Sequence, residues 1–96
     1  MITSKQRSKL RAMANDYDAI FQIGKSGITP VLARQVADAL EARELVKIHV
    51  LNNAEMDTRQ ACQELAAATD AEPVSCVGHK FVLYKQSRDN QRIVLD

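Results

Sequence analysis

The sequence predicts an α/β fold of the α+β kind, a two-layer sandwich with a mixed four-stranded sheet and the element order α-βαβαββ. The first observation behind this prediction is that stretches with helical and with strand periodicity alternate along the chain. The second is that crossovers between parallel strands are right-handed, which brings the two later helices to one face of the sheet. The third is length, because 96 residues with 46% hydrophobic content suffice for one domain, residues 1–96, with a modest core.

The first expected element is a helix from Ser4 to about Asn15, which should complete the helical layer or lie at an edge of the sheet. Its apolar residues recur three and four positions apart, as on one helix face: Leu10, Met13, Ala14 and Tyr17. Successive residues turn by about 100°, so Lys5 and Lys9 flank this face on one shoulder and Arg7 and Arg11 on the other. One row of RNA phosphates cannot contact all four cations at once. Either pair could make this contact, and the sequence does not decide between them.

The next expected elements are a strand from Ala19 to Ile23 and a helix from Pro30 to about Arg43. Thr29 can cap this helix with its hydroxyl, and proline suits the first helical position. A second strand is expected from Leu45 to Leu51. Alternation places three apolar residues on its covered face and two polar residues together on the other: Val46, Ile48 and Val50, then Lys47 and His49.

A third helix is expected after Asp57, which can act as its N-cap. Small and apolar residues supply the inner side of this helix: Ala61, Cys62, Leu65 and Ala68. Two further strands, Pro73 to Val77 and Lys80 to Lys85, flank Gly78-His79. A pair of this kind is typical of a two-residue hairpin loop.

The expected core covers residues 3–85, and residues 86–96 form a polar tail. The apolar end of the tail, Ile93 to Leu95, either adds a short strand or remains loose. Cys62 and Cys76 fall in segments expected to be helix and strand. Small buried thiols are the commonest explanation for such cysteines, and no CxxC spacing indicates a metal site or a disulfide scaffold.

The tetrapeptide Gly24-Lys25-Ser26-Gly27 lies between the first strand and the second helix. Glycine permits positive φ and leaves no side chain between the main chain and a ligand. The GXXG loop of KH modules grips a nucleotide backbone in this way. The helix that follows adds unpaired amides and the positive end of its dipole, which suit a phosphate. Glycine pairs also close ordinary strand-to-helix turns, so the charge around the loop matters.

Charge is unevenly distributed along the chain. Residues 1–34 contain six basic and two acidic residues, a net charge of +4, whereas residues 35–72 contain three basic and eight acidic residues, a net charge of −5. The remaining residues have a net charge of +2. A polyanion would attract the basic part, which includes the glycine loop, and the acidic helices would face away from it. The alternative is that the charged residues only form solvated surfaces that keep the protein soluble.

The residue pattern does not predict catalysis. His49 and His79 have no serine, cysteine or carboxylate at the spacing of a triad or a metal site, and Glu41 and Glu44 fall at an expected exposed helix end. No Walker loop or dinucleotide fingerprint is present. We therefore expect a protein that is not an enzyme and has no cofactor, metal or small-molecule substrate. Because no stretch reaches the roughly 20 apolar residues of a bilayer span, we expect it to be cytoplasmic, with no membrane partner.

Four segments, taken in order, resemble one family. They are Thr3–Arg7 with Leu10-Arg11, Gln22–Thr29, Ala42–Ile48, and Val77-Gly78 leading to Leu83–Lys85. Over about Thr3 to Lys85 they resemble the CRM domain (chloroplast RNA splicing and ribosome maturation), above all its stand-alone bacterial YhbY-like members. Ser26 stands where many members have a second glycine or another small residue. Lys85 stands where arginine is commoner, which keeps the charge but loses the fork that binds phosphate in two places.

This resemblance implies an RNA-binding protein that binds ribosomal RNA in precursors of the large ribosomal subunit and assists ribosome assembly. It also implies a fold similar to the C-terminal domain of translation initiation factor three. Carried over by position, the RNA-binding residues are those of the glycine loop and the basic first helix: Gly24, Lys25, Ser26, Gly27, Lys5, Arg7, Lys9 and Arg11. We expect a monomer.

Two alternatives follow from the residues. The first is a protein-binding adaptor in ribosome assembly that acts through its acidic helices, with Asp38 and Glu41 as test positions. The second is binding of double-stranded DNA, which is disfavoured because no helix combines basic and base-reading residues as a recognition helix does.

Overall fold

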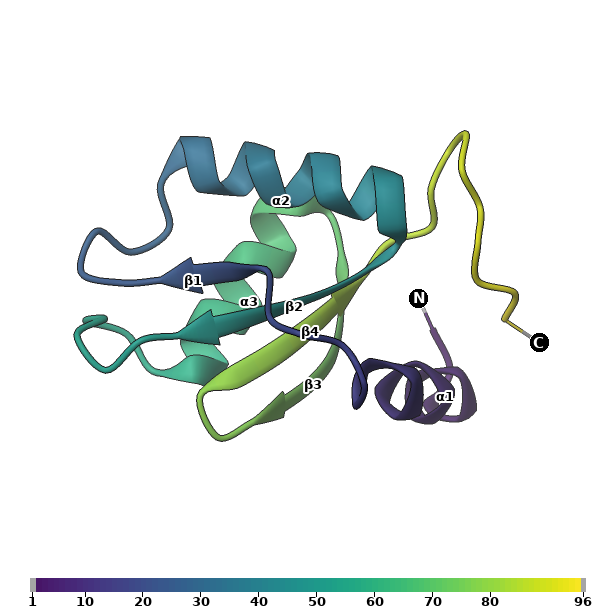
Figure 1. Ribbon diagram of the computed structural model, residues 1–96, viewed down its shortest axis with the longest axis horizontal. Helices are drawn as coiled ribbons and strands as arrows, with labels where there is room; N and C mark the ends of the chain where they lie inside the picture. The colour runs from purple at the N-terminus through teal and green to yellow at the C-terminus, as the bar shows by residue number, and fades with distance from the viewer. Residues whose placement is uncertain (1, 96) are drawn as a thin grey trace.

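The computed structural model describes residues 2–95, and its helices and strands follow the predicted order (Figure 1). They are α1 (Ser4–Ala14), β1 (Phe21–Ile23), α2 (Pro30–Arg43), β2 (Leu45–Val50), α3 (Thr58–Thr69), β3 (Glu72–Val77) and β4 (Lys80–Tyr84). The strands form a four-stranded sheet in the order β1-β2-β4-β3. β1 and β2 are parallel and the other neighbours are antiparallel, which confirms the predicted mixed sheet and fold class.

Capping side chains determine where the helices begin. Thr29 Oγ1 accepts a hydrogen bond from the amide of Leu32 at 3.1 Å, and Asp57 Oδ1 accepts one from the amide of Gln60 at 2.7 Å. Thr3 closes a capping box at the start of α1. Each cap satisfies an amide that would otherwise lack a partner, which typically stabilises a helix by about 1 kcal/mol. The starts of α2 and α3 therefore agree with the local sequence signals.

The main core lies between the sheet and a layer formed by α2 and α3. Side chains from both helices and from three strands are fully buried in it: Ile23, Val36, Leu40, Ile48, Leu65 and Phe81. Val46 and Val50 of β2 face the same core, as their alternation with Lys47 and His49 predicts. This face of the sheet is the one that the sequence identified as covered.

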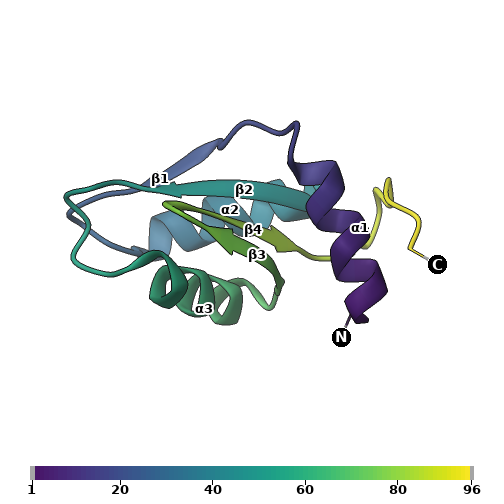
Figure 2. The ribbon, with the colours of Figure 1, turned by 90° about the horizontal axis from the view of Figure 1, so that it is seen from below.

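The position of α1 differs from the expectation that it would complete the helical layer or lie at an edge. Its Leu10 and Ala14 pack against Leu45, Val82 and Tyr84, which point away from α2 and α3. The reason is that this end of the second sheet face is apolar, so an amphipathic helix has to cover it. Figure 2 shows α1 crossing the strands at that end of the sheet. Beyond α1, the second face carries Lys47, His49 and Lys80 together with the exposed Val77.

The C-terminal tail is neither a strand nor loose, because two glutamates hold it. The buried Glu44 carboxylate accepts hydrogen bonds from the amides of Ser87 (2.8 Å), Arg92 and Ile93 (2.8 Å). Glu41 accepts bonds from the Ser87 hydroxyl and from the amides of residues 88 and 89. We call Glu41, Glu44 and the groups of residues 87–93 bonded to them the tail clasp. The expectation that these glutamates lie on an exposed helix end was wrong.

Candidate nucleic-acid interface

The glycine loop forms a tight turn that exposes its two central residues. The amide of Gly27 donates to the carbonyl of Gly24 at 3.0 Å, and Lys25 and Ser26 at the tip are exposed. Gly27 has φ +68°, in the left-handed region that glycine adopts without strain. Gly24 does not have a positive φ, and a Cβ there would lie 3.5 Å from Asn53 Oδ1, an ordinary contact. Backbone conformation therefore requires only the second glycine.

The start of α2 lies directly beyond this turn. Pro30 has no amide hydrogen, while the amides of Leu32 and Ala33 donate to the side chain and the carbonyl of Thr29. Within residues 2–95 the amide of Val31 has no acceptor. A donor at the positive end of the helix dipole thus lies near the tip of the loop.

A second loop, residues 51–57 between β2 and α3, lies beside the glycine loop (Figure 1). The amide of Leu51 donates to the carbonyl of Ile23 at 2.8 Å, and Met56 Cε lies 3.7 Å from the Cβ position of Gly27. The exposed Asn52 and Asn53 are therefore candidate contacts that the sequence prediction missed. The signal was available, because parallel strands bring the loops at their carboxyl ends to the same edge of a sheet.

The basic residues of α1 do not join the glycine loop in one patch. Figures 1 and 2 place α1 and the loop at opposite ends of a molecule that is 38 Å long. Arg7 Nε donates to the carbonyl of Pro73 at 3.2 Å, and Lys9 Nζ donates to the carbonyl of Val94 at 2.8 Å. The side chains of Lys5 and Arg11 are exposed and make no such bond in the described part of the chain. Each shoulder of α1 therefore keeps one available cation.

The tail clasp also removes acidic groups from the surface. The hydrogen bond from the Ser87 hydroxyl, followed by the Arg88 amide, lowers the pKa of Glu41. Burial raises the pKa of Glu44, but the amides of Arg92, Ser87 and Ile93 outweigh it, so that the net shift is also downward. Both carboxylates are therefore ionised at neutral pH and already paired with backbone donors. Glu41 is not available to the acidic adaptor surface considered above.

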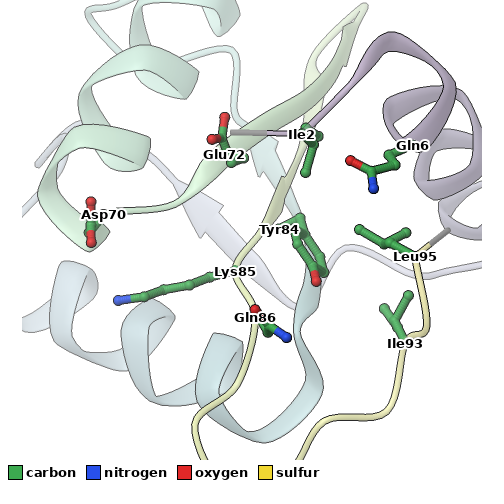
Figure 3. A pocket seen from close by; sticks show the side chains of 9 residues that line it. All are labelled: Ile2, Gln6, Asp70, Glu72, Tyr84, Lys85, Gln86, Ile93 and Leu95. Carbon is green, nitrogen blue, oxygen red and sulfur yellow. The ribbon is translucent and has the colours of Figure 1, made fainter.

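A hollow of about 490 Å³ lies between the start of α1, the end of β4 and the tail (Figure 3). Its lining includes the carboxylates Asp70 and Glu72. The cation in the lining, Lys85, donates to the carbonyl of Thr69 at 3.3 Å, which satisfies the last turn of α3. The balance of charge therefore does not favour a phosphate in this hollow.

Residues 2–95 contain no group of three or more histidine, cysteine, aspartate or glutamate side chains that could hold a metal ion. None of the helices in this range is long and apolar enough to cross a bilayer.

Known proteins are similar to this chain over almost its whole length. A Bacillus subtilis protein named "Probable RNA-binding protein YqeI" is 41% identical over 95 residues, which cover 99% of each chain. A Haemophilus influenzae protein named "RNA-binding protein" is 28% identical over 92% of this chain and 89% of its own. The solution structure of SAV1595 from Staphylococcus aureus, described there as a candidate for RNA binding, matches over 100% of both chains. Its TM-score is 0.84 and its sequence is 43% identical.

The model of the CRS1 / YhbY (CRM) domain matches residues 2–85, which span all the described helices and strands. The four motifs and the fold agree with this match. The chain belongs to the CRS1/YhbY (CRM) domain family.

Proposed function

We propose that this protein binds RNA and that the glycine loop is its primary contact. The observation that carries the proposal is the exposed Gly24–Gly27 turn at the start of α2, in a chain whose relatives are named as RNA-binding proteins. The turn presents backbone amides and the Lys25 ammonium on a surface with no competing carboxylate in the tetrapeptide. Phosphate oxygens are the ligands that such donors prefer.

Recognition of backbone and shape fits this surface better than base stacking. The aromatic residues are 2 phenylalanines and 2 tyrosines, with no tryptophan. Phe81 and Tyr84 are buried, and Phe21 packs against the main core. Tyr17 is 40% exposed, but it follows α1 and lies far from the loop. With few stacking platforms, the protein would read structured RNA through phosphates and 2′-hydroxyls.

The target that we propose is ribosomal RNA in precursors of the large ribosomal subunit, with a role in assembling that subunit. Family membership supports this target. Lys5 and Arg11 of α1 would extend the contact beyond the loop, whereas Arg7 and Lys9 are bonded to backbone carbonyls. A bound RNA would then span much of the 38 Å length.

Cosedimentation with ribosomal particles tests this proposal. Gly24→Asp places a carboxylate in the loop without requiring positive φ, and Gln35→Asp makes the same charge change on the exposed side of α2. We expect the native protein and Gln35→Asp to sediment with free or immature large subunits and Gly24→Asp to be lost from them. Thermal unfolding of each variant verifies its fold. Undiminished association of a folded Gly24→Asp variant would place the contact elsewhere.

A further inference from the structure

The second face of the sheet has an uncovered part between α1 and the glycine loop. Strand register defines it: Lys47 of β2 lies opposite Val82 of β4, and His49 lies opposite Lys80. These residues share the face on which Val82 contacts α1, because alternate residues of a strand point the same way. α1 covers the row that begins at Leu45 and the Val82 end of the next row, whereas the row of His49 and Lys80 lies beyond it.

A hollow of about 230 Å³ opens here against the end of α1. Three cations, two neutral polar residues and three apolar residues line it: Arg11, Lys47 and Lys80, then Asn15 and Ser75, then Ala14, Val77 and Val82. The lining contains no carboxylate. Among residues 2–95, the side chains of Arg11, Lys47 and Lys80 form no hydrogen bond or ion pair. We call these three residues the open-face cluster.

Three neighbouring cations without a counter-ion repel one another, and an anion bound among them would relieve this repulsion. The opposite arrangement occurs at the hollow of Figure 3, where carboxylates line the wall and Lys85 is bonded to a helix carbonyl. Compared with that hollow, charge and hydrogen bonding favour the open-face cluster as a site for a polyanion.

The location of the cluster indicates which polyanion. From Lys47 the strand runs past His49 to Leu51, about 13 Å away at roughly 3.3 Å per residue. The amide of Leu51 bonds the carbonyl of Ile23, and Leu51 Cδ1 lies 3.6 Å from the Cβ position of Gly24. The cluster therefore connects Arg11 of α1 with the glycine loop along one face. A single RNA segment can follow this path.

We propose that the open-face cluster is a second phosphate-binding site, which continues the RNA contact from the glycine loop across the sheet to α1. The proposal rests on the RNA binding proposed above and adds Lys47 and Lys80 to the residues involved. It predicts contact with the backbone of a folded RNA, since the hollow lacks an aromatic side chain on which a base could stack.

Filter binding with in vitro transcribed bacterial 23S ribosomal RNA at several KCl concentrations tests the proposal. Lys47→Gln/Lys80→Gln removes two charges from the cluster, and Arg34→Gln/Arg43→Gln removes two from exposed positions of α2. We expect the first variant to bind on the order of tenfold more weakly, with a slope of log K against log salt lower by about 1.5 to 2. The α2 control should bind like the native protein, and Lys47→Arg/Lys80→Arg should retain affinity.

Acetylation of the native protein gives a second measurement that does not depend on a variant folding. RNA should slow the modification of Lys47 and Lys80 and leave that of Lys85, which is bonded to Thr69, unchanged.

If Lys47→Gln/Lys80→Gln binds normally while Gly24→Asp does not, the second site is wrong and the loop proposal stands. If the native protein shows no salt-dependent binding, both proposals are wrong. If the open-face and α2 variants lose the same amount of RNA affinity, the loss reflects net charge alone, and the proposed second site is wrong.

Discussion

The two ends of the molecule use their polar groups in opposite ways. At the loop end, the Val31 amide and the Lys25 side chain have no partner in residues 2–95. At the α1 end, the polar groups bond to backbone: Arg7 to Pro73, Lys9 to Val94, and Glu44 to the tail. Both ends are charged, but at the α1 end only Lys5 and Arg11 keep side-chain donors available to a ligand. Whether a polar group lacks a partner within the protein, rather than its charge alone, therefore distinguishes a candidate binding group from a structural one.

The largest expected effect is the loss of stability when the tail clasp is broken. Glu44→Ala leaves the amides of Ser87, Arg92 and Ile93 without their acceptor, and hydrogen bonds to a charged group contribute more than neutral ones. We expect a loss of about 3 kcal/mol, or a decrease in Tm of roughly 10 to 20 °C. Thermal denaturation measures it. Glu44 has φ +67°, so Glu44→Gly relieves backbone strain while losing the same bonds and should be less destabilising.

If the clasp only supports the fold, folded Glu44→Gly should still bind RNA through the distant glycine loop. A Glu44→Gly variant that is folded at the assay temperature but lacks RNA affinity would contradict the division between the two ends.

The next largest effect is the difference in stability between substitutions of the two glycines of the loop. Gly27→Ala places a Cβ at φ +68° and should cost about 1 to 2 kcal/mol of stability. Gly24→Ala meets only ordinary contacts, the nearest at 3.5 Å, so its stability should change by less than about 0.5 kcal/mol. If RNA approaches this backbone closely, Gly24→Ala should nevertheless weaken RNA binding. Denaturant titration and filter binding on the same two variants measure both quantities, and equal stability losses would contradict the assignment.

Acid should weaken the clasp by less than Glu44→Ala does, because a protonated carboxyl can still accept a hydrogen bond. Hydrogen bonding holds the pKa values of Glu41 and Glu44 below the ordinary 4.5 of the unfolded chain. The stabilisation is therefore complete above about pH 4.5 and is lost as the pH falls through the lower folded values. Amide hydrogen exchange at Arg92 and Ile93 should accelerate, after correction for intrinsic rates, before exchange in β2 does. If the tail and β2 lose protection from exchange at the same pH, the tail does not open separately and the prediction is wrong.

Much of the fold was predictable because its signals are local. The predicted helix over Pro30 to Arg43 has the bounds of α2, where Thr29 and the proline mark the start. The Gly78-His79 turn joins β3 to β4 as predicted, with Gly78 at φ +60°. Cys62 is buried as expected, but Cys76 is exposed because it lies in β3 at the edge of the sheet.

The missed features depend on contacts between distant parts of the chain. Glu44 bonds to amides 43 to 49 residues later, and no spacing rule reveals such a partner. The face chosen by α1 likewise depends on Leu45, Val82 and Tyr84, which come together only in the folded sheet. The glycine loop was visible in the sequence, whereas the two asparagines beside it and the open-face cluster required the strand register.

The smallest expected effect compares cations within α1. Arg7→Gln/Lys9→Gln and Lys5→Gln/Arg11→Gln remove the same charge from one helix, so net charge cannot distinguish them. The first pair loses bonds to the carbonyls of Pro73 and Val94 and should mainly lower stability, by about 1 kcal/mol. The second pair makes no such bonds in the described part of the chain, so it should leave stability unchanged and lower the salt slope of RNA binding by about 1 to 2. Equal slopes for the two pairs would show that the backbone-bonded cations also reach RNA, and would end the distinction between available and structural charge on this helix.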